Sequence, residues 1–199
     1  MGIEFELKFR ATPIQQVLLM KKFPQEGQSF AMETVYYDTP DSALSRRAYT
    51  LRRRMENELS VCTLKVPSGT YGRGEFEVNC PTIEGAIPEL CKLSGIADLP
   101  ALLEKGITPV CGAKFTRIAK TIVMPTFTVE LALDSGILSG GGKEIPLCEV
   151  ELELKEGKAE DLIAFAKELA TEYALTPELK SKFARARALG REESNSNSL

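Results

Sequence analysis

The feature that most constrains the fold is an alternation of charged and apolar residues that begins near the N-terminus. In the stretch from residue 3 to residue 10 (IEFELKFR), Glu4, Glu6 and Lys8 share one phase and apolar side chains occupy the other. A period of two is typical of a β-strand with one charged and one apolar face. One such strand would be an ordinary half-exposed strand, but the pattern recurs with both signs of charge.

The alternation predicts about eight strands, mostly joined as hairpins. Charged doublets such as Arg52/Arg54 and Glu149/Glu151 keep one phase in several of them. After the first strand, the expected segments are residues 30–38, 49–56, 59–66, 73–80, 115–123, 127–134 and 145–155. Glycine and proline clusters between these segments favour turns. The chain is therefore expected to be rich in antiparallel sheet.

Helices are expected between the strands. Thr12, Pro13 and Gln15 form a helix start, with a capping threonine, a proline at the first position and a glutamine three residues after the cap. Further helical pieces are predicted in residues 81–110, in 158–173, and from Thr176-Pro177 onward. The last residues, 191–199, are polar and low in complexity and predict a disordered tail or linker. An α+β domain over residues 1–190 follows.

Composition excludes several classes of function. A net charge of −3 provides no positive excess for generic binding to nucleic acid or an anionic membrane. The sequence has no apolar run long enough for a transmembrane helix and no apolar signal region at its start. Five cysteines without a C-x-x-C pair favour reduced thiols in the cytoplasm.

The 199 residues contain no histidine. This excludes Ser-His and Cys-His nucleophilic chemistry, imidazole acid–base catalysis and histidine-ligated zinc. Carboxylates, lysine, tyrosine and metal-bound water remain as catalytic groups.

Two arrangements of the charged faces are open at this point. In the first, they face solvent and the apolar faces pack on helices as an open α+β layer. In the second, the strands close into an eight-stranded antiparallel β-barrel with a charged interior, surrounded by helices. Surface ion pairs contribute only about 0–1 kcal/mol each, which does not explain so many charged doublets. Unpaired charges in an interior cost several kcal/mol unless ligands neutralise them.

A charged interior suits a complex of metal and polyphosphate. The cations would hold phosphate oxygens, with bidentate contacts from arginine: Lys8, Arg52, Arg54, Lys65, Arg73, Arg117, Lys182 and Arg185. Carboxylates would repel phosphate directly but would bind Mg²⁺ or Mn²⁺: Glu4, Glu6, Glu75, Glu130, Asp134, Glu149 and Glu151.

Several motifs in order carry a family resemblance. They are Glu4-x-Glu6-x-Lys8, Tyr36-Tyr37-Asp38-Thr39-Pro40, Arg52-x-Arg54, Thr63-Leu64-Lys65, Arg73-x-Glu75, Phe115-x-Arg117, Glu130 to Gly136, Glu149-Val150-Glu151 and Ser181-Lys182-x-x-Arg185. Together they resemble the CYTH superfamily of triphosphate tunnel metalloenzymes, most closely its bacterial inorganic triphosphatase branch. That resemblance implies a closed eight-stranded tunnel that hydrolyses inorganic triphosphate with Mg²⁺ or Mn²⁺, two ions per site. It also implies catalytic roles for Glu4, Glu6, Lys8, Glu149 and Glu151.

The resemblance leaves alternatives open. Thiamine triphosphatases and class IV adenylyl cyclases share the tunnel, and a non-catalytic polyphosphate- or nucleotide-binding module would need the same cations. Phe115 departs from the family pattern, because many relatives have a basic residue there. Glu153 extends the acidic run and has no assigned role. Members of the branch often carry a C-terminal CHAD-type domain, which this sequence does not contain, so an absent domain or an excised fragment is expected.

Overall fold

The computed structural model describes residues 5–68 and 72–190. Within these residues it contains six helices and nine strands. Glu4 and the predicted tail over residues 191–199 lie outside the described residues. The strands are β1 (Glu6–Arg10), β2 (Gln28–Asp38), β3 (Thr50–Glu56), β4 (Leu59–Ser68), β5 (Gly72–Asn79), β6 (Thr108–Val123), β7 (Thr128–Gly140), β8 (Lys143–Glu156) and β9 (Thr176–Pro177). The helices are α1 (Pro13–Lys22), α2 (Ala43–Arg46), α3 (Ile83–Ser94), α4 (Leu99–Leu103), α5 (Ala159–Glu172) and α6 (Lys182–Leu189).

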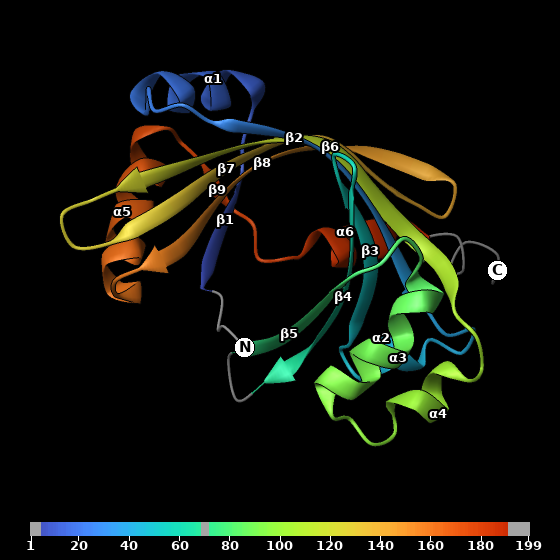
Figure 1. Ribbon diagram of the computed structural model, residues 1–199. Helices are drawn as coiled ribbons and strands as arrows, with labels where there is room; N and C mark the ends of the chain where they lie inside the picture. The colour runs from blue at the N-terminus through green and yellow to red at the C-terminus, as the bar shows by residue number, and fades with distance from the viewer. Residues whose placement is uncertain (1–4, 69–71, 191–199) are drawn as a thin grey trace.

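All nine strands form one sheet in the order β5-β4-β3-β2-β6-β7-β8-β1-β9. Every recorded pairing is antiparallel, with hairpins between β3 and β4, β4 and β5, β6 and β7, and β7 and β8. The sheet is strongly curved, so that it forms an arch with a concave and a convex side (Figure 1). This confirms the antiparallel α+β class predicted from the alternation.

The expectation of a closed eight-stranded barrel is wrong for the described residues. The sheet ends at β5 on one side and at β9 on the other, and no ladder joins these edges within residues 5–68 and 72–190. The outer edge of β1 is partly occupied, because Phe9 and Arg10 pair with Pro177 and Thr176 of β9. The short strand β9 therefore lies where a closing strand would have to pair.

The same segment corrects the prediction of a helix from Thr176-Pro177 onward. These two residues form β9, and the amide of Glu178 donates a hydrogen bond to the carbonyl of Lys8 at 2.8 Å. The last helix begins only at Lys182, where the Ser181 hydroxyl caps it by accepting from the Ala184 amide. A free strand edge nearby outweighed the local helix-start signal.

Two apolar cores lie between the sheet and its outer helices. One packs α1 and α5 against β1, β7 and β8, with Leu19, Leu131 and Leu152 fully buried. The other packs α2, α3 and α4 against β3, β4 and β5, around Leu51, Leu64 and Leu90. These helices lie on the outside of the arch (Figure 1). In β1, β3, β4, β5, β7 and β8 an apolar phase therefore faces these outer helices, and the charged phase is left for the concave side.

Helix α6 differs from the others because it lies under the arch (Figure 1). It packs on β6 and β7 with Ala186 and Phe183, against Met32, Tyr36 and Phe115 from the sheet. The approach is so close that a Cβ atom at Gly140 would lie 2.1 Å from the carbonyl oxygen of Ala186. Glycine at this position therefore permits α6 to fill one end of the concave side.

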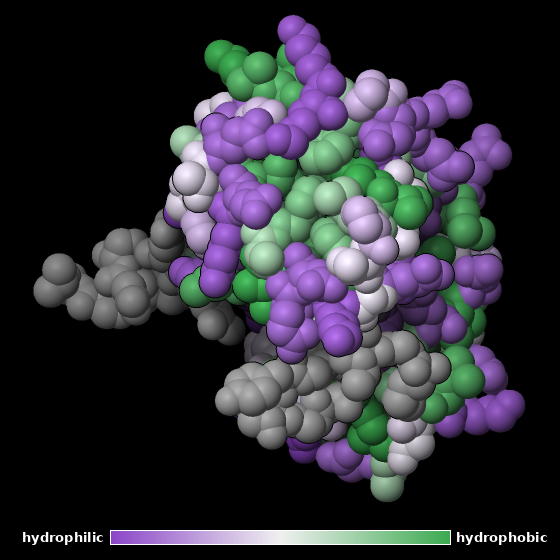
Figure 2. All heavy atoms as spheres, turned by 90° about the vertical axis from the view of Figure 1, so that its left-hand side faces the viewer, coloured by the Kyte–Doolittle hydropathy of each residue, from purple (hydrophilic) through white to green (hydrophobic). Residues whose placement is uncertain are grey.

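Helix α1 begins as predicted. Thr12 and Gln15 form the reciprocal capping box, with Pro13 at the start of the helix. Its outer face exposes Ile14, Val17 and Leu18, and hydrophobic side chains are visible at the top of Figure 2, where α1 lies. None of the helices in the described residues is both long and apolar enough to cross a membrane.

Candidate active site

The concave side of the sheet contains a cavity of about 940 Å³. Its walls come from one phase of each of the strands β1 to β8, uncharged in β2, and from residues 179–184 at the start of α6. Ten of the predicted site residues line it: Glu6, Lys8, Arg52, Arg54, Lys65, Glu75, Arg117, Glu130, Glu151 and Lys182. The arrangement in which the charged faces point to bulk solvent is therefore excluded, although the sheet stays open.

Five predicted residues are not in this lining. Asp134 and Glu149 are 0% exposed and lie behind the cavity surface, and Arg185, 14% exposed, pairs with Glu149. Glu4 and the side chain of Arg73 lie outside the described part of the chain.

One side of the cavity carries the basic wall, which we define as Arg52 and Arg54 of β3 and Lys65 of β4. The Nη2 atom of Arg52 lies 3.3 Å from Glu75 and 3.9 Å from Glu77, and Lys65 Nζ lies 3.0 Å from Glu75. Arg54 pairs with Glu56. Within residues 5–68 and 72–190, the buried Nε atoms of Arg52 and Arg54 have no hydrogen-bond partner, nor have those of Arg185 and Arg187. Buried unsatisfied donors are rare in folded proteins, so the N–H groups of Arg52 and Arg54, which line the cavity, are suited to an anionic ligand.

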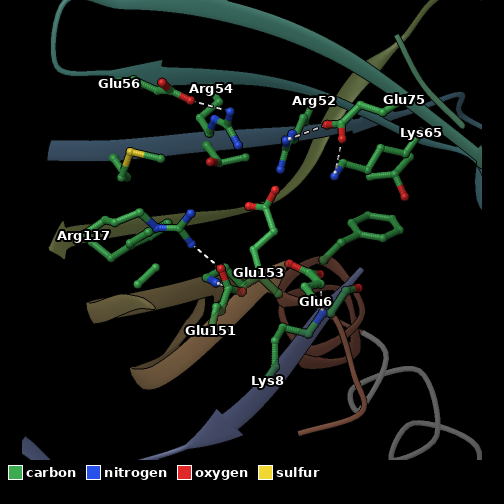
Figure 3. A pocket seen from close by; sticks show the side chains of 18 of the residues that line it. Glu6, Lys8, Arg52, Arg54, Glu56, Lys65, Glu75, Arg117, Glu151 and Glu153 are labelled. Atoms are coloured by element: carbon green, nitrogen blue, oxygen red, sulfur yellow. Dashed lines mark hydrogen bonds and ion pairs between the residues drawn. The ribbon is translucent and has the colours of Figure 1, made fainter. Parts of the chain in front are cut away.

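The opposite side carries the acidic triad, which we define as Asp134, Glu149 and Glu151. One oxygen from each carboxylate lies within 4.8 Å of the others. Asp134 and Glu149 are cross-strand partners on β7 and β8, and Glu151 follows in the same phase of β8. In Figure 3, Arg52 and Lys65 lie on one side of the cavity and Glu151 on the other, with Glu153 projecting between them.

Three cations neutralise the acidic triad. The Lys182 ammonium lies 2.8 Å from both Asp134 and Glu151 and also contacts Glu149. Arg117 makes a bidentate pair with Asp134, at 2.8 and 2.7 Å, and contacts Glu151. Arg185 pairs with Glu149. Three carboxylates and three cations form a balanced cluster, which is what allows these charges to be buried.

The pKa values within this cluster move in opposite directions. Burial lowers the pKa of Lys182, but Glu151, Asp134 and Glu149 raise it by more, so it lies above its ordinary value. Burial raises the pKa of Glu151, and Lys182 and Arg117 lower it further than burial raises it. Burial raises the pKa of Glu149, and the nearby charge of Glu151 adds to that rise against Lys182. The cations of the cluster therefore favour the ionised form of Glu151, whereas burial disfavours the ionised form of Glu149.

Phe115 stands where the family resemblance predicts a second basic residue. Its ring lies at the border between the triad and the apolar contacts of α6. The Lys182 Nζ atom is 5.2 Å from the ring centroid and the Arg117 guanidinium carbon is 5.8 Å from it. Both are within cation–π distance. A fourth cation at this position would leave the cluster with excess positive charge.

A family model described as the CYTH domain matches residues 2–186. The chain belongs to the CYTH domain family. The cavity described above is therefore the cavity of a CYTH domain.

A curated protein similar to this chain is named as a triphosphatase. An inorganic triphosphatase from Haemophilus influenzae is 32% identical over 195 residues, which cover 94% of this chain and 55% of that protein. The chain therefore spans about half the length of this curated relative.

Solved structures show the same fold at lower identity. A candidate adenylate cyclase from Bacillus halodurans superposes with a TM-score of 0.63 at 16% identity, covering 90% of this chain and 94% of that chain. A candidate adenylyl cyclase from Hippeastrum, described as having a dominant triphosphatase activity, superposes with a TM-score of 0.61 at 19% identity, covering 97% and 96%.

Several charged residues that line the cavity of this CYTH domain were not among the predicted site residues, although Glu153 is visible in the sequence as an extension of the acidic run. They are Glu56, Glu77, Glu153 and Lys155, all of which line the cavity. Glu153 is the cross-strand partner of Glu6, and Lys155 lies 2.8 Å from Glu153 and 3.6 Å from Glu130. Each continues the phase of a predicted site residue on its own strand. The strand phase was therefore the signal that could have found them.

The donor set fits a hard divalent cation. The acidic triad offers carboxylate oxygens at a spacing that one ion could bridge, and Mg²⁺ and Mn²⁺ prefer oxygen ligands. Glu6, Glu130 and Glu153 add carboxylates that face the cavity. In the structure, the triad carboxylates are paired with Arg117, Lys182 and Arg185. A metal ion bound at the triad would coordinate the same oxygen atoms that these cations contact.

Proposed function

We propose that this CYTH domain hydrolyses inorganic triphosphate to pyrophosphate and phosphate with the help of Mg²⁺ or Mn²⁺, two ions per site. The observation that carries the proposal is that the basic wall lines the cavity on one side, while Glu151 of the acidic triad lines it with Glu6, Glu130 and Glu153 on the other. The cations of the basic wall match phosphate oxygens, whereas carboxylates match the metal ions that accompany polyphosphates.

The basic wall would bind and orient the phosphate chain. Arg52 and Arg54 stand two residues apart on β3, and Lys65 is the cross-strand partner of Thr50, so the three cations form a row about 13 Å long at the usual strand rise. Lys8 and Lys182 would add contacts from the other side of the cavity. Fixed positive groups around the leaving pyrophosphate would stabilise the charge that accumulates there.

The carboxylates would hold the metal ions and accept a proton from the attacking water. When bound, Mg²⁺ or Mn²⁺ supplies charge neutralisation on phosphate oxygens and lowers the pKa of a coordinated water. Glu6, Glu151 and Glu153 face the cavity and could accept the proton that water loses. Water would attack the terminal phosphorus, the P–O bond to the pyrophosphate would break, and the pyrophosphate would leave with that electron pair. Glu4 would belong to the same set by its motif.

A panel of substrates tests the proposal. Purified protein would be incubated with tripolyphosphate, thiamine triphosphate or ATP in Mg²⁺ or Mn²⁺, with phosphate and cyclic AMP measured. Fastest phosphate release from tripolyphosphate supports the proposal. Faster release from thiamine triphosphate, or cyclic AMP from ATP, assigns the cavity to one of those rivals. Tight binding of tripolyphosphate with no phosphate released over hours indicates a binding module.

We also infer a cytoplasmic location, because all five cysteines are free thiols.

A further inference from the structure

Gln16 is a buried glutamine on α1 that reaches the acidic triad from the outer side of the sheet. Its exposed fraction is 6%. Its Nε2 group donates to the backbone carbonyl of Asp134 at 3.0 Å and to that of Glu149 at 2.9 Å. Its Oε1 atom accepts from the hydroxyl of Ser135 at 2.6 Å. Both N–H donors of the amide and its carbonyl oxygen are therefore used.

The two carbonyls belong to the two fully buried members of the triad. Asp134 on β7 and Glu149 on β8 are cross-strand partners. Their carboxylates meet Arg117, Lys182 and Arg185 on the concave side, while α1 lies on the convex side (Figure 1). A single amide thus bridges β7 and β8 at the level of the triad.

Helix α1 has other anchors, so this bridge is not needed to dock the helix. Leu19 is 0% exposed in the apolar core beneath it. The Gln15 amide donates to the carbonyls of Tyr173 at 2.7 Å and Ala174 at 3.1 Å. Gln15 and Gln16 therefore make the same kind of contact, a side-chain amide bridging two backbone carbonyls. Only the contacts of Gln16 lie on the triad strands.

We propose that Gln16 is a positioning residue that sets the separation and orientation of Asp134 and Glu149 through their backbone. The expected effects on Mn²⁺ binding and turnover rest on the proposed function, whereas the effect on the geometry of the two carboxylates does not. Groups that orient metal-binding carboxylates typically change metal affinity or activity 10- to 100-fold when they are removed. Because Gln16 acts through the backbone, we expect the lower end of that range, about 10-fold.

The experiment compares Gln16→Met with Gln15→Met. In either variant, methionine keeps the length of the side chain and removes the NH₂ donor and the carbonyl acceptor of the amide. Three properties are measured for the full chain: the melting temperature, the Kd for Mn²⁺ alone by electron paramagnetic resonance, and kcat and KM for tripolyphosphate. Gln16→Glu is added, because it keeps the shape and one acceptor but cannot donate to the carbonyls when ionised.

We expect Gln16→Met and Gln16→Glu to weaken Mn²⁺ binding and to lower kcat by about 10-fold, with KM changed less than kcat. Gln15→Met should lower the melting temperature while keeping Mn²⁺ affinity and kcat within about two-fold. The proposal is overturned if Gln16→Met lowers the melting temperature but keeps the wild-type Kd and kcat, since Gln16 would then only hold α1.

A further readout separates this proposal from the proposed function. The side-chain carboxyl ¹³C shifts of Asp134 and Glu149 report their local geometry in the folded protein without substrate or metal. If wild-type protein neither binds Mn²⁺ nor hydrolyses tripolyphosphate, the proposed function fails. The positioning role then stands if both shifts move in Gln16→Met and not in Gln15→Met, and it falls if they do not move.

Discussion

The basic wall and the acidic triad are both held by ion pairs but differ in how far their defining side chains are buried. In the triad, each carboxylate is matched by a cation, and Asp134 and Glu149 are fully buried. In the basic wall, Arg52, Arg54 and Lys65 pair with neighbouring carboxylates, and their side chains are 14%, 19% and 21% exposed. Two of the three triad carboxylates are sealed behind the cavity, whereas all three cations of the basic wall line it, where an anion can reach them.

This difference assigns different roles to the two regions. Burial of a balanced cluster stabilises the fold only while every partner is present, because one missing partner leaves an uncompensated charge. Burial and the neighbouring charge of Arg52 lower the pKa of Arg54, so bringing an anion to this wall relieves repulsion between the two arginines. We therefore expect substitutions in the triad to affect stability most and substitutions in the basic wall to affect turnover most.

The largest effect is expected for Lys182→Met. Its ammonium contacts all three triad carboxylates, so its removal should lower the free energy of unfolding by about 3–5 kcal/mol, as for other broken buried ion pairs. Denaturation with urea measures this change. Lys92→Met is the control, since Lys92 is exposed on α3 with a single weak pair to Glu89 and should change stability by less than about 0.5 kcal/mol. Equal small effects in both variants would contradict the balanced cluster.

Arg52→Ala should reduce turnover strongly and stability only slightly, the reverse of what is expected for a substitution in the triad. Turnover of tripolyphosphate should fall about 10²- to 10³-fold, because a fixed donor at the phosphate chain is lost. Stability should change little, since Lys65 remains 3.0 Å from Glu75 after Arg52 is removed. Phosphate release and urea denaturation are measured on the same preparation. The matched control is Arg47→Ala, an exposed arginine that pairs with Asp98 away from the cavity. Comparable turnover in both variants would remove Arg52 from the site.

Ligand binding should stabilise the protein through the basic wall. Tripolyphosphate with Mg²⁺ at a concentration 100 times its Kd should add about 2.7 kcal/mol to the free energy of unfolding, because the ligand binds only the native state. Differential scanning calorimetry measures the shift. The increase should disappear in Arg52→Ala and persist in Arg47→Ala. A shift that Arg52→Ala retains would place the anion elsewhere.

The smallest effect is a difference in pH dependence within the triad. The folded-state pKa of Glu151 is lowered, so Glu151 stabilises the fold above its unfolded value of about 4.3 and loses this contribution as pH falls. The folded-state pKa of Glu149 is raised, so its contribution is present below about 4.3 and is lost as pH rises through that raised pKa.

The stability of wild type minus variant, measured by urea denaturation from pH 3 to pH 7, should therefore rise with pH for Glu151→Gln and fall for Glu149→Gln. Each pKa unit corresponds to about 1.4 kcal/mol. Slopes of the same sign for the two variants would contradict the environments assigned here.

Much of this arrangement could be predicted from the sequence, because strand phase decides which side chains share a face. The phase of Arg52 and Arg54 and that of Glu149 and Glu151 placed these residues on one face of the sheet. The structure brings Arg52, Arg54 and Glu151 to one cavity and buries Glu149 behind it. Phase alone could not show that β9 would pair with β1 and leave the sheet open, since edge pairing depends on tertiary contacts. Nor could it show Gln16, whose role depends on which strands lie beneath α1.

The most direct test is a crystal structure of the protein with tripolyphosphate and Mn²⁺. The account predicts phosphate density against Arg52, Arg54 and Lys65, and anomalous manganese signal between that density and the carboxylates of the opposite wall. Phosphate and manganese bound outside this cavity, with the Nε atoms of Arg52 and Arg54 still unpaired, would contradict it.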